Sequence, residues 1–445
     1  MGRHADGEIR AEAQRASDAR GSRGNGNRAV LPRVAMSPFF RRVVFSHRWV
    51  WCLLVLMNFF GCRGSTPMPP SGSVPPASKA FWLTRPELPA FTDDLDRESL
   101  HQALQRSLEY ARRLQPDQTL PCGERQISGT MLVQTLEAFQ QVVATASTPA
   151  ALQQAIRERF HVLQSPGRDE RGEVLFTGYY EIELEGSLVP SPRFPYPLYK
   201  RPPDLIDVEA KPSVPWPGVG RPGALANQGQ TGSYYTRREI DGEGKLRGRG
   251  LELFWLRNPV DGFFLHVQGS GQIRLPDGQV RRVHYAASNG YPYHSIGRVL
   301  LEEGRLPRDA LSLQGLRRYF RDHPEETTRV LYRNPRYVFF RPVAQGPQGN
   351  LGLILVPGRS IAADQRLFPP GGLAFVQLQQ PVLNAQGEIT AWRPASRFVF
   401  NHDTGSAIMG PGRIDLFWGS GAQAEMAAGH MQHTGKLFFL LKRAS

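Results

Sequence analysis

The pattern of apolar and polar positions changes at about residue 174, and this change divides the chain into a helical part and a strand-rich part. Before that point, apolar residues recur at three- and four-residue steps, at Leu100, Leu104, Leu108, Ala111 and Leu114. This spacing places them on one face of a helix. We predict two further helices, one over residues 130–146 and one that begins after Thr148, a residue type that caps helix N-termini.

From residue 174 onward, short runs of β-branched and aromatic residues alternate with glycine-containing turns. A helical interlude is predicted over residues 295–332. Residues 263–274 and 279–286 flank the turn sequence Pro276-Asp277-Gly278 and are predicted to be the strands of a hairpin. Further strands are predicted over residues 174–184, 337–341, 374–378, 397–400, 413–418 and 436–441. Strands of this length between glycine turns favour a closed barrel over a parallel α/β sheet.

The N-terminal region has the architecture of an export signal. About a dozen apolar residues, 49–60, follow a basic stretch that contains Arg41 and Arg42, and the run ends in Gly61-Cys62. A membrane-spanning helix needs roughly 20 apolar residues, so the run is too short to span. Gly61-Cys62 resembles a lipoprotein cleavage box, and we predict that Cys62 is lipidated. Ordinary secretion and twin-arginine export remain alternatives.

Residues 1–62 are therefore predicted to be a disordered leader followed by a signal peptide, with Met36 as a candidate start in place of Met1. Residues 63–80 are rich in Pro and Ser and are predicted to be a linker that holds the folded body away from a membrane. Because Arg63 rather than an aspartate follows the cysteine, we expect the protein at the periplasmic face of the outer membrane, held there by a lipid anchor.

Charge and cysteine content restrict the possible chemistry only in part. The formal net charge is +14, so nucleic acid, anionic lipid and acidic glycans all enter as partners of a basic surface. Part of this charge lies in the arginine-rich stretch before residue 50, so charge does not select among them. Cys52, Cys62 and Cys122 form no CxxC pair or Cys/His cluster, and no structural zinc site is expected.

The densest cluster of unusual residues is at 402–421. Asp403 and Asp415 lie twelve residues apart there, separated by small residues and glycines. Phe417 and Trp418 offer flat apolar faces of the kind on which sugars stack. A carboxylate beside aromatic side chains loses hydration, so its pKa rises and it keeps the proton that a general acid requires. Alternatively, an aspartate before Thr-Gly caps a turn, and one of the two aromatic residues fills the core.

Asp403-Thr404-Gly405-Ser406 also matches the signature of aspartic proteases. Those enzymes need two carboxylates that share a proton, hence two such loops in one chain or in a homodimer. This chain has one copy and is too long for the small homodimeric form, which disfavours a protease.

Several longer motifs, in the correct order, resemble the membrane-bound lytic murein transglycosylase A family. They are FTGYYE at 176–181, YPLY at 196–199, RREIDG at 237–242, FLHVQGSG at 264–271, NGYPY at 289–293, NPRYVFF at 334–340, PGRSIAAD at 357–364 and the segment 403–419. The resemblance runs from about residue 174 to 442. The family's terminal domain is named after three aspartates, which are matched here by Asp364, Asp403 and Asp415.

The resemblance implies a mainly β fold with N-terminal helices, in which a double-psi β-barrel carries a second, inserted β-rich domain. We expect an N-terminal helical part over residues 81–173, packed on the barrel. The inserted domain is expected over 174–342 and lines a substrate groove, and the three-aspartate barrel domain is expected over 343–445.

The family also implies a lytic transglycosylase, which cleaves the β-1,4 bond between N-acetylmuramic acid and N-acetylglucosamine in the glycan strands of peptidoglycan. Asp415 is the expected catalytic residue. It would protonate the glycosidic oxygen and then take the proton of the muramic acid C6 hydroxyl, which closes a 1,6-anhydro ring.

The remaining site residues are expected to assist this step. Asp403 and Asp364 would orient the substrate or maintain the barrel. A further set would bind sugar or support the site: Tyr180, Gln268, Gly269, Ser270 and Gly271. The resemblance implies no metal, no cofactor and no nucleic acid. A non-catalytic peptidoglycan-binding lipoprotein remains the alternative.

Overall fold

The computed structural model describes residues 88–208, 221–227 and 230–443, which belong to one compact unit. The predicted leader, Cys62 and the predicted linker lie outside these residues. Within the described ranges, no helix has the length and apolar character needed to cross a membrane.

The described chain begins with three helices, α1 (Arg97–Ala111), α2 (Gly129–Thr145) and α3 (Pro149–Arg159), and a short hairpin of β1 (Thr119–Cys122) and β2 (Arg125–Ser128). The apolar stripe predicted from the sequence is the buried side of α1, except that Leu114 lies just beyond the end of the helix and is only partly buried. Asp96, Ser128 and Thr148 each accept a backbone N–H at the start of a helix. The three predicted helices are confirmed.

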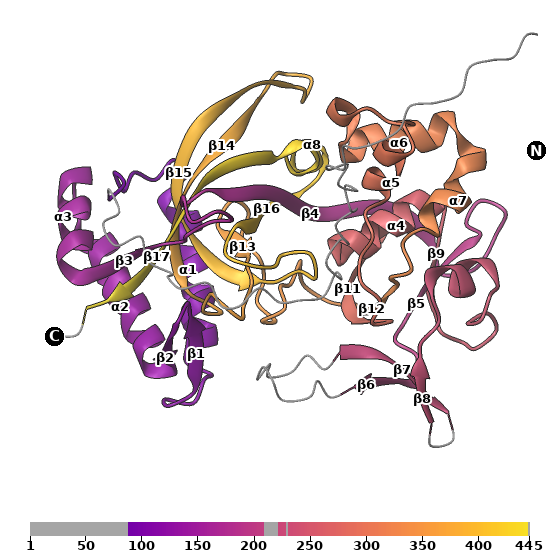
Figure 1. Cartoon of the computed structure of the whole chain (residues 1–445), viewed down its shortest axis with the longest axis horizontal. Helices are drawn as coiled ribbons and strands as arrows, with labels where there is room; N and C mark the ends of the chain where they lie inside the picture. Colours follow the sequence, from indigo (N-terminus) through magenta and orange to yellow (C-terminus); the bar gives the residue numbers. More distant parts are fainter. Residues whose placement is uncertain (1–87, 209–220, 228–229, 444–445) are drawn as a thin grey trace, which may run out of the picture. The chain divides into compact units, whose positions relative to one another are not determined.

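Six strands pair in a closed cycle (Figure 1). β4 (Val174–Ser187) pairs in parallel with β16 (Arg413–Ser420), and β16 pairs with β13 (Ser360–Ala362). β13 pairs in parallel with β15 (Ile389–Asp403), which pairs with β14 (Leu373–Leu383). β14 pairs with β17 (Gln432–Lys442), and β17 returns to β4. β3 (Phe160–Gln164) extends the sheet from β17. The described protein is thus mainly β with N-terminal helices, as predicted.

One hydrophobic core joins the N-terminal helices to this strand cycle. Phe139 of α2 packs on Phe398 of β15, with ring centroids 4.8 Å apart. Phe91 lies against Phe375 and Phe398, at 5.0 and 6.1 Å between centroids. Aromatic contacts of this kind contribute beyond the area that they bury. The helices are therefore part of the same folded body as the strands.

The chain between β4 and β13 forms a second group of elements around its own hydrophobic core. β4 continues into it, where β10 (Ser270–Arg274), β11 (Val280–Ser288) and β12 (Val338–Val343) follow in order across the sheet. The other strands are β5 (Tyr196–Tyr199) and β9 (Glu252–Leu256), and the separate sheet of β6 (Leu205–Val208), β7 (Arg221–Asn227) and β8 (Gln230–Ser233). The helices are α4 (Pro259–Gln268), α5 (Ile296–Glu302), α6 (Leu313–Asp322) and α7 (Thr327–Leu331). The predicted helical interlude is confirmed.

One predicted strand is wrong in its first half. Residues 263–268 belong to α4, and only the residues from Ser270 onward are extended. The Asn258 side chain accepts the Val260 N–H, and Gly269 ends the helix with a φ of 81°. A short run of aromatic and apolar residues fits a strand and a buried helix equally well, and only these caps distinguish them. The hairpin turn itself is confirmed, because Gly278 N donates to Leu275 O at 2.9 Å.

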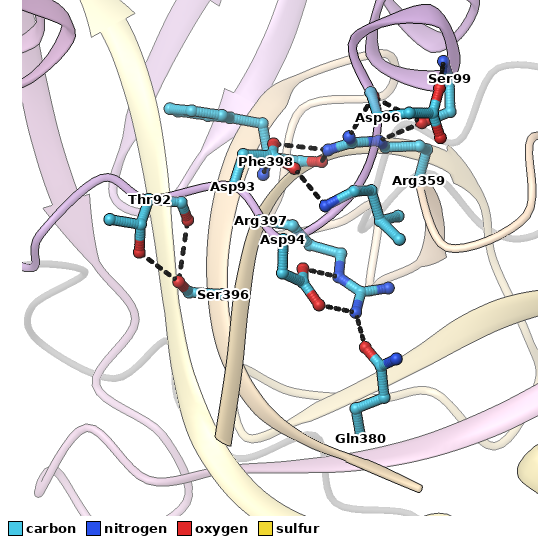
Figure 2. Close-up of polar contacts among 11 residues, drawn as sticks. Thr92, Asp93, Asp94, Asp96, Ser99, Arg359, Gln380, Ser396, Arg397 and Phe398 are labelled. Carbon is cyan, nitrogen blue, oxygen red and sulfur yellow. Dashed lines mark hydrogen bonds and ion pairs between the residues drawn. The ribbon is translucent and has the colours of Figure 1, made fainter. Parts of the chain in front are cut away.

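Two buried arginines fasten residues 92–99, which we call the strap, to the strand cycle (Figure 2). Arg359 donates to Oδ2 of Asp93 at 2.6 Å, and Arg397 makes two bonds to Asp94, at 2.8 and 2.7 Å. The side chains of the two arginines are 0% and 1% exposed. A buried cation is tolerated only when it is paired, so the strap is integral to the fold.

Candidate active site

Asp403 and Asp415, which are predicted from the sequence to carry the chemistry, lie in one row across the strand cycle. Ala362 on β13 pairs with Asp403 of β15 on one side and with Asp415 of β16 on the other. Asp415 pairs in turn with Thr177 of β4. Neighbouring strands lie about 4.8 Å apart, so the Cα atoms of the two aspartates are roughly 10 Å apart. Paired residues face the same side of a sheet, which brings the two carboxylates together.

Asp415 is partly exposed and has few partners. Its Oδ1 accepts a hydrogen bond from the Thr177 hydroxyl, and no other hydrogen bond reaches this carboxyl from the described residues. Burial raises the pKa of Asp415 to about 6, against a smaller opposing effect of Arg413. A carboxyl with this pKa gives up and regains a proton near neutral pH, as acid–base catalysis requires.

Asp403 is held by three donors. Its Oδ1 accepts from Asn350 N at 2.9 Å and Thr404 N at 2.8 Å, and its Oδ2 accepts from the Tyr179 hydroxyl at 3.1 Å. Burial raises the pKa of Asp403 to about 6, while these three bonds act in the opposite direction and the Asp415 charge adds a smaller increase. Bonds of this kind favour the charged form. The Thr404 contact joins the Asp403 side chain to the residue directly after it, and the turn cap considered as an alternative for this residue stays a prediction.

Asp364 has a supporting position. The Arg366 guanidinium binds both its oxygens, at 2.8 and 2.6 Å, and Gly410 N donates to Oδ2 at 2.7 Å. Burial alone would raise the pKa of Asp364, but these bonds outweigh it and hold the pKa below its usual value. Asp364 thus stays ionised and fixes the loop between β15 and β16. The expectation that it maintains the strand framework agrees with this position.

Two site residues, Thr177 and Tyr179, were missed in the sequence analysis, although both lie in the motif at 176–181. Successive side chains of a strand point to opposite faces. Thr177 and Tyr179 therefore share the face that carries the aspartates, and Tyr180 points away. Tyr180 is 1% exposed and belongs to the second hydrophobic core. The two-residue period of β4 is the signal that would have found them.

The segment from Gln268 to Gly271 links α4 to β10 and contacts the neighbouring strand β4. The Gln268 side chain accepts the Tyr180 N–H at 3.1 Å. Ser270 is buried, and Gly271 lies so close to Ile182 that a Cβ atom there would stand 2.9 Å from Ile182 Cγ2. Gly269 supplies the left-handed residue that ends α4. These contacts position the segment, and its role in binding sugar stays a prediction.

One predicted sugar-stacking face is wrong. Phe417 is 1% exposed and packs on Tyr179, with ring centroids 5.3 Å apart. It is buried against Tyr179 and therefore offers no free face to a sugar. Trp418 is partly exposed, but its Nε1 donates to the sulfur of Met431 at 3.3 Å and its ring contacts both hydrophobic cores.

No group of three or more His, Cys, Asp and Glu side chains in the described parts of the chain is placed to hold a metal ion. Cys122 is a free, buried thiol, and burial raises its pKa to about 12. A thiol in this state is an apolar core residue without nucleophilic character at neutral pH.

Two family models and several known proteins match the part of the chain that contains the candidate active site. The profile described as "MltA specific insert domain" matches residues 175–341, and the profile described as "3D domain" matches residues 359–441. The chain is 33% identical to the membrane-bound lytic murein transglycosylase A of Vibrio cholerae over 309 residues, or 68% of this chain and 74% of that protein. It is 30% identical to the protein of the same name from Escherichia coli K12 over 62% of this chain and 68% of that protein.

Solved structures agree with the sequence matches. The crystal structure of a membrane-bound lytic murein transglycosylase from Agrobacterium tumefaciens superposes with a TM-score of 0.65 and 34% identity, and covers 78% of this chain and 93% of that one. Escherichia coli MltA with bound chitohexaose superposes with a TM-score of 0.61 over 83% of this chain and 98% of that one. Its 24% identity in that superposition shows a common fold.

Proposed function

Because the chain belongs to the membrane-bound lytic murein transglycosylase A family, we propose that it is a lytic transglycosylase that cleaves the glycan strands of peptidoglycan, with Asp415 as the acid and base. The scissile bond is the β-1,4 bond between N-acetylmuramic acid and N-acetylglucosamine. The observation that carries the assignment to Asp415 is a partly exposed carboxyl whose pKa is raised to about 6 and whose only hydrogen-bond partner among the described residues is one hydroxyl.

The different surroundings of the two aspartates support different roles. Asp403 accepts three hydrogen bonds that stabilise its charge, whereas Asp415 accepts one. When the pair holds one proton, that proton therefore resides on Asp415, and Asp403 stays ionised. An acid beside a fixed negative charge is the arrangement that an oxocarbenium-like transition state requires.

The reaction then proceeds without water as a nucleophile. Asp415 gives its proton to the glycosidic oxygen as the bond from C1 of muramic acid to that oxygen breaks. The C6 hydroxyl oxygen of the same sugar bonds to C1, and the Asp415 carboxylate takes the proton that this hydroxyl releases. One carboxyl serves both steps and ends in its starting state, so no second carboxylate is needed to activate water.

Mass spectrometry of products formed from purified sacculi in heavy-oxygen water tests this reaction. We expect muropeptides that are lighter than hydrolytic fragments by one water and that carry no label. Labelled reducing ends as the main product would show hydrolysis instead of ring closure. Binding to sacculi with no soluble product from the wild-type protein would favour the alternative, a non-catalytic peptidoglycan-binding lipoprotein.

The proposal extends to the domain organisation. The cycle of six strands, with parallel pairs β4–β16 and β13–β15, supports a double-psi β-barrel. We assign residues 81–173 to the N-terminal helical part, 174–342 to the inserted domain and 343–445 to the three-aspartate barrel domain. Substrate would lie in a groove between the last two.

The location of the protein is part of the same proposal. We infer a lipoprotein whose mature chain begins at a lipidated Cys62 and is held at the periplasmic face of the outer membrane. The support is the order of basic stretch, short apolar run and Gly61-Cys62, followed by Arg63 and a Pro/Ser-rich stretch.

A further inference from the structure

A concave site separate from the candidate active site lies entirely in the part of the chain between β4 and β13. It is a cavity of about 870 Å³, bounded by β5, the β9–α4 connection, α6 and α7. None of the three aspartates of the candidate active site lines it. Its size falls within the range of sites that enclose a small ligand. The cavity is therefore distinct from the candidate active site, and its function has to be inferred from its own lining residues.

The side chains around this cavity carry an excess of positive charge. Five arginines and two aspartates line it. Both aspartates are already paired, Asp241 with Arg237 at 3.4 Å and Asp261 with Arg317 at 3.2 Å. His266 adds no charge, because burial holds its pKa well below the usual value. The net charge of the lining thus favours an anionic ligand.

Three arginines remain, and two of these have no acidic partner. Arg257 pairs with Glu185 at 3.0 Å. Arg247 and Arg321 are exposed and have no carboxylate within ion-pair distance among the described residues. Guanidinium groups in this state offer paired N–H donors that match the two oxygens of a carboxylate.

The interior of the cavity is partly aromatic. The Arg237 guanidinium lies between the rings of Phe263 and Tyr337, at 4.8 and 5.1 Å from their centroids, and its side chain is 3% exposed. It also binds Nδ1 of His266 at 2.8 Å. Tyr196, at the rim, is 42% exposed. Such a site suits a ligand that has apolar atoms as well as charge.

We propose that this cavity binds the carboxylates of a short acidic peptide, the stem peptide attached to muramic acid. The identification of the peptide rests on the proposed function, since a glycan-cleaving enzyme meets that peptide on its substrate. The glycan backbone of peptidoglycan has no net charge, whereas the stem peptides carry free carboxylates. A cavity lined by five arginines, two of which have no ion-pair partner among the described residues, therefore matches the peptide and not the sugars.

Calorimetric titration of the purified full-length protein with a synthetic stem tetrapeptide tests this binding. The wild-type protein should bind the tetrapeptide, and the same peptide with amidated carboxylates should bind at least about tenfold more weakly. The double variant Arg247→Gln/Arg321→Gln should show a similar loss. The matched control Arg281→Gln, an exposed arginine on β11 outside the cavity, should bind as the wild type does.

Activity measurements separate this proposal from the proposed function. The double variant should cleave peptide-free glycan strands at the wild-type rate and show a raised KM on intact sacculi. Asp415→Asn should lose cleavage of both substrates and keep peptide binding. Equal binding of the free and amidated peptides, an unchanged affinity in the double variant, or displacement of the peptide by chitohexaose would each overturn the peptide site while leaving the catalytic assignment intact.

Discussion

The Thr177 hydroxyl donates a hydrogen bond to Oδ1 of Asp415 from the neighbouring strand β4. A hydroxyl carries one donor and two acceptor positions, so it can bind a carboxylate and, after rotation, a protonated carboxyl. The contact therefore holds the Asp415 side chain in one orientation while its protonation state changes. It is the one hydrogen bond that this carboxyl receives from the described residues, which makes Thr177 a positioning residue.

Thr177→Val should lower kcat roughly 10- to 100-fold and leave KM nearly unchanged, because shape is kept and the single hydrogen bond is lost. Thr177→Ser keeps the hydroxyl and should retain most of the activity. Steady-state kinetics on isolated glycan strands distinguishes the two variants. Equal rates in both would remove Thr177 from the mechanism.

Asp415→Asn should abolish release of anhydro products, because the amide keeps the shape of the side chain and cannot donate the proton as the acid does. The variant should still bind sacculi and keep the fold of the wild type, as judged by circular dichroism. Turnover at the normal rate would transfer the acid–base role to Asp403, which shares the row of Ala362.

The raised pKa of Asp415 also predicts how activity and stability change with pH. The acid must be protonated, so kcat/KM should fall as the pH rises through about 6. The folded state binds this proton more tightly than the unfolded state, in which an aspartate titrates near 3.8. The resulting stabilisation is complete below 3.8 and is lost as the pH rises through about 6.

Urea unfolding of Asp415→Asn at two pH values checks this sign without any assay of activity. At pH 7.5 the variant should be more stable than the wild type by on the order of 1–2 kcal/mol, because it removes a half-buried charge. At pH 4 the difference should nearly disappear. A destabilised variant at pH 7.5 would contradict the assignment of a raised pKa.

Arg359→Leu should destabilise the protein by about 3–5 kcal/mol, since it removes one partner of a buried ion pair and with it one of the two attachments of the strap. The free energy of unfolding measures the loss. Arg298→Ala is the matched control, because Arg298 pairs with Glu302 at 2.7 Å on the exposed face of α5, and such pairs contribute less than about 1 kcal/mol. Equal losses in the two variants would show that the strap adds nothing to stability.

Cys62→Ser should release the protein from the membrane fraction and leave the cleavage of isolated sacculi unchanged. The predicted lipid is attached to this side chain, and the residues that carry the chemistry begin more than a hundred positions later. Intact-mass analysis of the native protein gives the direct evidence. An unmodified N-terminus on a soluble wild-type protein would exclude the lipid anchor.

The sequence correctly predicts those helices whose formation depends on residues close to one another along the chain. The apolar steps of α1 and the cap at Thr148 predict helices because both act within one or two turns. The strand predicted over residues 263–268 was wrong, because the aromatic residues there fit the periodicity of a helix as well as that of a strand. The caps at Asn258 and Gly269 show that these residues form a helix. Local pattern therefore fails where an element is short and buried.

The full set of residues in the candidate active site could not be predicted from local sequence patterns, because it depends on which strands pair. The aspartates could be picked out from a cluster of unusual residues and a family resemblance, but their partner Thr177 lies 238 positions before Asp415. Only the pairing of β4 with β16 brings them together, and no periodicity encodes which strands pair. The cavity beside α4 could not be predicted from the sequence either, because its arginines come from separate elements.

The strap determines where mechanical load enters the folded body. With the anchor that we propose at Cys62, a pull between membrane and cell wall would travel along the chain to Asp93 and Asp94. There it divides between Arg359, whose neighbour Ser360 begins β13, and Arg397 within β15. These strands carry Ala362 and Asp403. β16, which carries Asp415, pairs with β13 at Ala362, so a load on the strap would reach the candidate catalytic carboxyl through this strand pairing.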